Sequence, residues 1–186
     1  MIGFMSIKLK IPVNENDHHK NSLRAPVILL EYGDFECPYC AVASTVISRL
    51  LQEYRSDLCF AFRHFPLKGI HPSAELSAIA AEAAGLQDKF WDMHNLLFAG
   101  QENLSKKSIY MLAKKIRLDM DRFQIDMERY DLLEKVRSDH QSGIQSGVQS
   151  TPSIFINGHQ FEGSTSYWPL RDAIEDELGT RDSASF

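Results

Sequence analysis

A short motif with two cysteines, EYGDFECPYC at residues 31–40, is the feature that most constrains the fold of this chain. An apolar run from Pro26 to Leu30 precedes the motif and indicates a buried strand, whereas a helical pattern follows from Ala41 to about Tyr54. The two cysteines therefore stand where a strand passes into a helix.

This position suits thiol chemistry. Only a thiolate attacks a disulfide, and the unpaired N–H groups at a helix N-terminus stabilise the negative charge of a cysteine there. Cys37 is placed to be that thiolate, and Pro38 fits the first helical position because it has no N–H to leave unpaired. Cys40 lies on the same helix face and can close a disulfide with Cys37. We therefore expect Cys37 to be the exposed attacking thiol and Cys40 the more buried resolving thiol.

The alternative is a structural use of the cysteines. A zinc site needs four ligands, and the nearest set would be Cys37, Cys40, Cys59 and His64. The helix between Cys40 and the next strand is about 20 Å long at 1.5 Å per residue, so Cys59 should lie at the far end of the sheet. We therefore expect no metal site here and interpret Cys59 as a small buried hydrophobic residue.

Composition and charge narrow the class of protein. The chain has 186 residues and a net charge of −5, which suits one globular domain with an insertion and gives no basic surface for nucleic acid. Three cysteines make no disulfide framework. Residues 1–24 show no signal-peptide core, and no stretch approaches the roughly 20 apolar residues of a membrane span. We expect a cytoplasmic protein without a membrane partner.

The remaining pattern indicates the order of elements. Alternation over Ser6–Val13 predicts an N-terminal strand, and residues 14–23, with His18 and His19, predict a solvated loop without a metal role. Asp57–Phe65 predicts a strand parallel to the first buried one. Helical patterns follow from His71 to about Gly147, then a hairpin around Asn157-Gly158 and a last helix over Ser166–Leu178, with a frayed tail from Gly179.

In this order the sequence resembles the DsbA-like branch of the thioredoxin superfamily. The resemblance is carried by residues 31–40, FRHFPL at 62–67, residues 71–98, GVQSTPSIFINGHQFEG at 147–163, and the closing helix. It implies an α/β, thioredoxin-like fold with an all-helical domain inserted between the βαβ and ββα halves. We expect residues 1–69 to form the first half, 70–147 the insertion and 148–186 the second half.

The resemblance also implies roles for single residues. Cys37 corresponds to the nucleophile and Cys40 to the resolving cysteine. The Thr151-Pro152 pair corresponds to a loop with a cis-proline, and with Pro38 and Tyr39 it is expected to contact the substrate, which can add as a strand. Glu31 corresponds to a buried acid that relays the proton of Cys40; its alternative partner is Arg63.

The Pro38-Tyr39 dipeptide of the CPYC motif departs from the family pattern, because exported DsbA proteins usually carry a histidine where Tyr39 stands. Tyr39 supplies no positive charge beside Cys37. We therefore expect a reduction potential nearer the roughly −200 to −230 mV of glutaredoxins than the roughly −120 mV of DsbA. His64 and His71 are candidates for adjusting the pKa of Cys37, and His94 is expected in the core or an interface.

The predicted function is thiol–disulfide exchange with protein or peptide substrates, with no cofactor besides the Cys37–Cys40 disulfide. The electron donor could be glutathione or a thioredoxin system, and the protein a monomer or homodimer. Three other functions stay open: a glutathione-dependent transferase or isomerase, a metal or iron–sulfur carrier that uses the CPYC thiolates, and a peptide-binding module without redox turnover.

Overall fold

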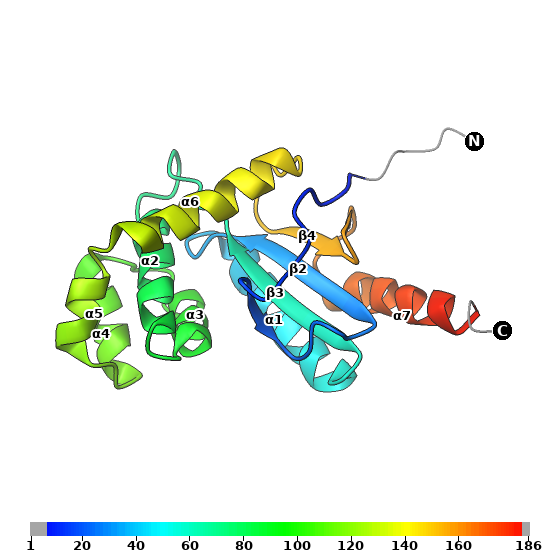
Figure 1. Ribbon diagram of the computed structural model, residues 1–186, viewed down its shortest axis with the longest axis horizontal. Helices are drawn as coiled ribbons and strands as arrows, with labels where there is room; N and C mark the ends of the chain where they lie inside the picture. The colour runs from blue at the N-terminus through cyan, green and yellow to red at the C-terminus, as the bar shows by residue number, and fades with distance from the viewer. Residues whose placement is uncertain (1–6, 184–186) are drawn as a thin grey trace.

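A five-stranded sheet in the order β1-β3-β2-β4-β5 forms the centre of the protein, in a computed structural model that describes residues 7–183 (Figure 1). The strands are β1 (His18–Lys20), β2 (Val27–Gly33), β3 (Leu58–His64), β4 (Ser153–Ile156) and β5 (His159–Gln160). The helices in the described residues are α1 (Pro38–Tyr54), α2 (Ala74–Gly85), α3 (Phe90–Ala99), α4 (Lys106–Lys115), α5 (Met120–Asp126), α6 (Tyr130–Gln145) and α7 (Tyr167–Ser183).

The two central strands, β2 and β3, run parallel and are joined by α1, as the sequence predicts. β4 pairs with β2 in the antiparallel direction, and β5 returns beside β4. Asn157 and Gly158 have φ of 47° and 80°, which is the left-handed backbone that a two-residue hairpin requires and that Asn and Gly tolerate best. The predicted hairpin is therefore confirmed.

Alternating side chains of the sheet enter two separate cores. Leu29 of β2 and Phe60 and Phe62 of β3 belong to the larger core, together with α1, α7 and the inserted helices. Leu30 and Tyr32 point to the opposite face, where they form a smaller core. Because strand side chains alternate, Glu31 shares the face of Leu29 and lies on the side of the sheet that α1 covers.

Helices α2 to α6 lie between β3 and β4 in the sequence, and α2 to α5 stand beside the sheet rather than over it (Figure 1). Two of the inserted helices have side-chain caps: the Ser105 hydroxyl accepts from the Ser108 N–H, and Asp119 accepts from two N–H groups of α5. This arrangement is the predicted α/β, thioredoxin-like fold with an all-helical insertion.

Helix α6 brings the chain back across the second face of the sheet. The hydroxyls of Tyr32 and Ser142 are hydrogen-bonded at 2.8 Å. Gly143 packs so closely that a Cβ there would lie 2.7 Å from the ring of Phe65. A glycine at this point of α6 therefore lets the helix approach the sheet.

The N-terminal strand is where the prediction fails. Ser6 lies outside the described residues, and of Ile7–Val13 only Lys8 forms a bridge, with His159. The edge strand is instead β1, within the segment expected to be a loop, and it pairs with β3. The reason is Arg63, whose guanidinium binds Asp17 at 2.7 Å and donates hydrogen bonds to the backbone carbonyl oxygens of Ile11 and Pro12. These carbonyl oxygens therefore accept from the Arg63 side chain and not from the backbone N–H groups of a neighbouring strand.

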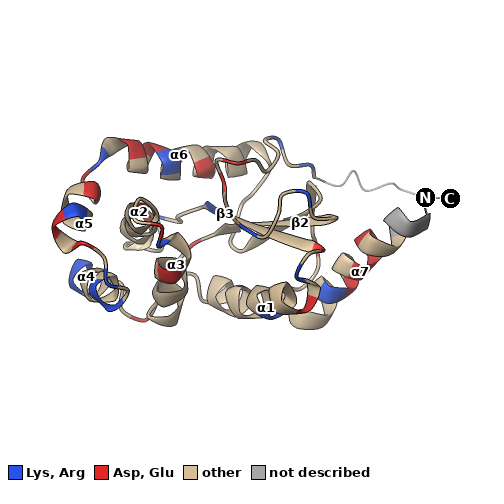
Figure 2. Ribbon diagram, turned by 60° about the horizontal axis from the view of Figure 1, so that its bottom comes forward, with Lys and Arg blue, Asp and Glu red and all other residues tan. Residues whose placement is uncertain are grey.

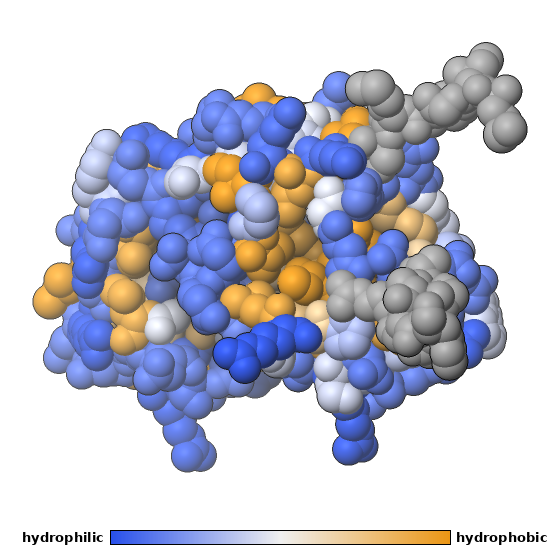
Figure 3. Space-filling model, turned by 45° about the vertical axis from the view of Figure 1, so that its right-hand side comes forward, coloured by the Kyte–Doolittle hydropathy of each residue, from blue (hydrophilic) through white to orange (hydrophobic). Residues whose placement is uncertain are grey.

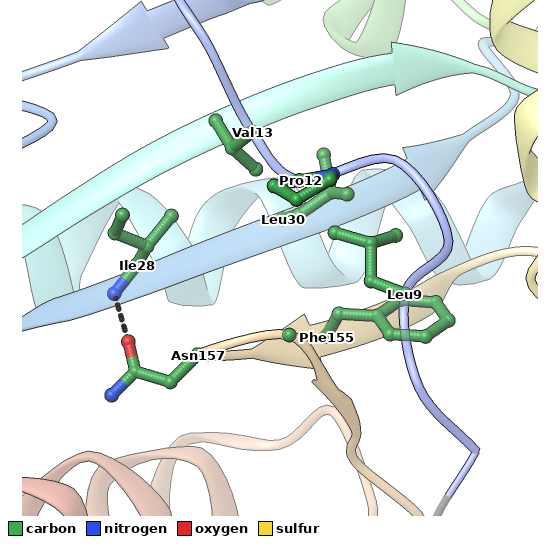
Figure 4. Close-up of a pocket in the computed structure, with 8 residues that line it drawn as sticks. Leu9, Pro12, Val13, Ile28, Leu30, Phe155 and Asn157 are labelled. Atoms are coloured by element: carbon green, nitrogen blue, oxygen red, sulfur yellow. Dashed lines mark hydrogen bonds between the residues drawn. The ribbon is translucent and has the colours of Figure 1, made fainter.

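An apolar groove remains where residues 9–13 cross the second face of the sheet. Figure 3 shows apolar side chains gathered near the middle of this side of the molecule. In Figure 4 Pro12 lies over β2, Val13 over β3 and Leu9 beside Phe155, and the Asn157 side chain accepts a hydrogen bond of 2.9 Å from the Ile28 N–H. The lining residues are Leu9, Pro12, Val13, Ile28, Leu30, Phe155, Asn157 and Gly158.

Charge and helix length complete the description. Lysines gather on α4 and acidic residues on α7 (Figure 2). Helix α7 runs to Ser183, so the tail expected to fray from Gly179 is helical for four further residues. Among the described residues no helix has the length and apolar character to cross a membrane.

Candidate active site

Cys37 is the N-cap of α1, with extended backbone angles of φ −75° and ψ 119°, and Pro38 begins the helix. The Cys40 N–H donates to the Cys37 carbonyl oxygen at 3.1 Å, so Cys40 lies one turn further on. Both are free thiols. Pro38 and Tyr39 are exposed, Tyr39 at 71%.

The expectation that Cys37 is the exposed thiol is wrong for the structure as it stands. Cys37 is only 3% exposed and Cys40 is fully buried. The reason is a contact from the far half of the chain: the Cys37 thiol donates to the Thr151 carbonyl oxygen at 3.2 Å. Attack on a substrate therefore requires the substrate to approach where Thr151 now covers the sulfur.

The Thr151-Pro152 segment reaches Cys37 because of strand pairing. Ser153 begins β4 and pairs with Tyr32, near the end of β2, so the two residues before β4 lie beside the loop that carries the cysteines. The Thr151-Pro152 peptide bond is cis. Thr151 is buried, and its hydroxyl has no hydrogen-bond partner within the described part of the protein.

The surroundings of Cys37 favour its thiolate. A hydrogen bond from the Cys40 thiol lowers the pKa of Cys37 to about 5, from an ordinary value of 9.0, against the opposing effect of burial. The Thr151 side chain and the N–H groups of Tyr39 and Cys40 lower the pKa of Cys37 further. These interactions favour the Cys37 thiolate at neutral pH, and in that form Cys37 no longer donates to the Thr151 carbonyl oxygen.

The pKa values of Cys40 and Glu31 are raised, in contrast to that of Cys37. Burial raises the pKa of Cys40 well above its ordinary range, and the hydrogen bond that it gives to Cys37 adds to this. Burial also raises the pKa of Glu31 to about 8, although the nearby Cys40 thiol partly offsets the rise. Neither Glu31 oxygen has a hydrogen-bond partner in the described residues. Pairing with Arg63 is wrong, because Arg63 binds Asp17 on the other face.

A second acid, Asp34, organises the loop that leads to Cys37. Its carboxylate accepts from the N–H groups of Glu36 and Leu67 and lies 2.8 Å from His71 Nδ1. The Asp34 N–H itself points at Cys40 Sγ, 3.5 Å away. Asp34 follows a buried strand, which was the available sequence signal, but Leu67 and His71 lie more than thirty residues away and the sequence does not reveal them as its partners.

Gln101, just after α3, is a further residue that the sequence analysis missed. Its side-chain Nε2 donates to the carbonyl oxygens of both Phe35 and Cys37, each at 3.1 Å. Glu36 makes a second link, because its carboxylate accepts from the Ser73 N–H at the start of α2. The helical insertion is therefore hydrogen-bonded directly to the loop that carries Cys37.

The histidines take other partners. His64 lies against Glu82 and His71 against Asp34, and neither is among the groups that shift the pKa of Cys37. His94 is a core residue surrounded by aromatic rings. Cys59 and His64 lie near opposite ends of β3, about 17 Å apart at 3.3 Å per residue, so they cannot share one zinc ion with the CPYC motif.

The fold and the cysteine pair agree with a match to a family model. The model described as Thioredoxin matches residues 13–176, which is most of the chain. The chain belongs to the thioredoxin family. Solved structures of DsbA-type proteins share its fold, and this thioredoxin-family protein has the DsbA-like fold that the sequence predicts.

Solved structures of two such proteins illustrate the similarity. Oxidised BdbD from Bacillus subtilis superimposes with a TM-score of 0.81 and 25% identity, covering 94% of this chain and 97% of BdbD. The α-DsbA1 protein of Wolbachia pipientis gives a TM-score of 0.80 at 20% identity, covering 92% and 95%. The second likeness concerns the fold alone.

The relatives found among curated sequences are named as antiporters. A protein named Na(+)/H(+) antiporter NhaA 1 from Salinispora arenicola is 38% identical over 94% of this chain, but the match covers only 27% of that protein. The corresponding antiporter of Herminiimonas arsenicoxydans is 35% identical over 93% of this chain and 28% of its own length. The chain thus spans about a quarter of the length of these relatives.

Proposed function

We propose that this protein is a thiol–disulfide oxidoreductase that exchanges disulfides with protein or peptide substrates through Cys37 and Cys40. The observation that carries the proposal is the opposed ionisation of the two thiols one helical turn apart. The pKa of Cys37 is lowered to about 5, whereas that of Cys40 is raised by burial. Such a pair provides one thiolate for attack and keeps the second thiol protonated until it is needed.

The exchange proceeds in two steps. The Cys37 thiolate attacks one sulfur of a substrate disulfide, a bond forms between Cys37 and that sulfur, and the other substrate sulfur leaves as a thiolate. Cys40 then loses its proton and attacks Cys37 Sγ, which releases the substrate as a dithiol and leaves the Cys37–Cys40 disulfide. Two electrons pass from the cysteine pair to the substrate, and no further cofactor is needed.

Glu31 is proposed to accept the proton of Cys40 in the second step. The acid is buried on the Cys40 side of β2 and its oxygens have no competing partner in the described residues. With a pKa raised to about 8, it is a stronger base when ionised than an ordinary carboxylate. At pH 7, one unit below that value, about a tenth of the molecules carry the ionised acid.

The substrate site is proposed at the surface formed by Pro38, Tyr39 and the Thr151-Pro152 segment. Pro38 and Tyr39 are exposed beside Cys37, and the Thr151 carbonyl lies against the sulfur. An extended substrate segment that pairs with the backbone of Thr151 would bring its disulfide to Cys37 in place of the present contact.

The direction of exchange is proposed to be reduction or general exchange rather than strong oxidation. Tyr39 is 71% exposed and brings no cation to Cys37, which supports a potential near the roughly −200 to −230 mV of glutaredoxins. A cysteine pair of this potential is suited to the cytoplasm, with glutathione or a thioredoxin system as electron donor. The protein is proposed to act as a monomer or homodimer.

Trapping the mixed disulfide tests the proposal. A Cys40→Ser variant keeps the attacking thiol but cannot resolve, so it should accumulate disulfide-linked substrate peptide after oxidative challenge. Cys59→Ser is the matched control, because Cys59 is buried with a pKa raised to about 11 and should leave trapping and turnover unchanged. Failure of Cys40→Ser to form any adduct through Cys37 would contradict the proposal.

A further inference from the structure

Two histidines from different strands converge on one carboxylate oxygen beside the helical insertion. His18 Nε2 lies 2.9 Å and His64 Nε2 lies 2.8 Å from the same Oε1 atom of Glu82. The three residues come from β1, β3 and α2, which are far apart in the sequence. Imidazole nitrogens and carboxylate oxygens are donor groups that zinc and related divalent metals bind.

Both rings are fixed by aromatic packing. The His18 ring stacks on Phe90 with centroids 3.4 Å apart and planes 6° from parallel, and His64 meets Phe35 and Phe62 at ring distances of 5.9 and 5.5 Å. The two nitrogens are therefore held in place before any ligand arrives.

A fourth polar group stands close by. Donor atoms of His64, Glu82 and Asp139 lie within 4.8 Å of one another, and all three residues are buried. Asp139 is now bound by Lys135 at 2.7 Å, and the Lys135 side chain is 26% exposed, so it can turn toward solvent. The His18 side chain is 24% exposed, which leaves a path of entry from solvent.

The separations between the donor atoms can be compared with those in a zinc site. Zinc binds histidine nitrogen at about 2.0 to 2.1 Å, which puts tetrahedral ligand atoms about 3.3 Å apart. The observed separations are shorter by about half an ångström, a difference that rotation of the Glu82 side chain can supply.

We propose that His18, His64 and Glu82 form a binding site for a divalent transition metal, with Zn²⁺ as the best-fitting ion and Asp139 as the nearest further donor. The ion replaces the two N–H···O hydrogen bonds by bonds to the imidazole nitrogens. It joins β1 and β3 to α2 and so fastens the helical insertion to the sheet. His64 packs on Phe35, in the loop before Cys37, so the site supports the active-site loop without containing the reacting thiols.

Zinc binding must be measured with the active-site thiols blocked, since thiolates also bind zinc. The protein is first oxidised to the Cys37–Cys40 disulfide, then dialysed against buffered Zn²⁺, and bound zinc is counted per chain. The wild-type protein should bind one zinc ion, and zinc should raise its unfolding temperature, because a ligand that binds only the folded state stabilises it.

The matched variants are His18→Gln and His19→Gln. His19 is the next residue of β1 and lies near Glu15 and the Asn21 carbonyl instead of Glu82. His18→Gln should weaken zinc binding about tenfold or more and remove the thermal shift, and His19→Gln should change neither. Glu82→Gln, which is nearly isosteric, should lose zinc binding as His18→Gln does. It provides the test if the His18→Gln variant folds poorly.

The outcomes separate the metal site from a plain ion-pair cluster. Absence of bound zinc in the oxidised wild-type protein would overturn the proposal. Equal loss of zinc in His18→Gln and His19→Gln, or wild-type affinity in a folded Glu82→Gln variant, would overturn it as well.

Discussion

Cys37 Sγ and the carbonyl oxygen of Thr151 are 3.2 Å apart although 114 residues separate them in the sequence. The contact joins the two halves of the thioredoxin fold, because Cys37 is the N-cap of α1 and Thr151 precedes β4. The helical insertion lies between them in the chain, and Gln101 reaches from it to the same loop. The reacting sulfur is thus bounded by all three parts of the protein.

Alkylation of Cys37 should follow the ionisation of its thiol. Since the hydrogen bond from Cys40 lowers the pKa of Cys37 to about 5, the alkylation rate of the reduced protein should rise through that pH and level off by about pH 7. Cys40 should stay unmodified over the same range. Mass analysis of iodoacetamide-treated protein gives both rates, and a Cys37 midpoint near its ordinary value of 9.0 would contradict the assigned ionisation.

Replacing Glu31 by Gln should slow resolution of the mixed disulfide more than its formation. Without the base, release of a Cys37-linked peptide should slow on the order of 10²-fold at pH 8, whereas the alkylation rate of Cys37 should change little. Stopped-flow measurements of both steps against pH make the comparison. A resolution rate that keeps the wild-type pH profile would remove the role assigned to Glu31.

The same variant should change the pH dependence of stability. The folded-state pKa of Glu31 is raised from 4.5 to about 8, so folding binds an extra proton between these values. Its contribution to stability is fully present below about pH 4.5 and is lost as the pH rises through 8. In denaturant unfolding, the Glu31→Gln variant should therefore gain stability relative to the wild type as the pH rises from 5 to 8, and should keep that gain above pH 8. A constant difference from pH 5 to 9 would contradict the shift.

Gln101→Ala should loosen the loop that carries Cys37. Two hydrogen bonds to Phe35 and Cys37 are lost, which should cost about 1 to 3 kcal/mol of unfolding free energy. Cys37 should also become easier to reach, so its alkylation rate above pH 7 should increase. The exposed neighbour Glu102 provides the control, because Glu102→Ala removes a side chain without a contact to this loop. Equal behaviour of the two variants would refute the assignment.

Asp17→Asn should destabilise the N-terminal segment strongly. The ion pair with Arg63 is buried, with side-chain exposures of 3% and 5%, and breaking one partner of such a pair costs about 3 to 5 kcal/mol. The exposed Glu15, changed to Gln, is the control. Urea unfolding checks both variants, and similar midpoints for the two would show that the pair contributes little.

Local signals in the sequence located the elements that bear the cysteines. The CPYC motif and the Asn157-Gly158 turn each act within a few residues, and each lies where the sequence pattern placed it. The parallel pairing of β2 and β3 follows from the short connection through α1. These features depend on neighbours in the sequence, which a single chain displays.

What the sequence did not reveal depends on partners far along the chain. Arg63 draws residues 11–17 onto the sheet from 46 positions away, which moved the edge strand to β1. The burial of Cys37 depends on Thr151, and the support of its loop depends on Gln101. His18 looked like a solvated loop residue because nothing near it in the sequence indicates Glu82.

The most direct test of the account is the redox equilibrium of the purified protein with glutathione, measured by alkylating free thiols and determining the protein mass by mass spectrometry. The account predicts one intramolecular disulfide between Cys37 and Cys40, a potential near the roughly −200 to −230 mV of glutaredoxins, and a Cys59 thiol that stays reduced. Absence of an intramolecular Cys37–Cys40 disulfide at any glutathione ratio would contradict thiol–disulfide exchange as the function of this site.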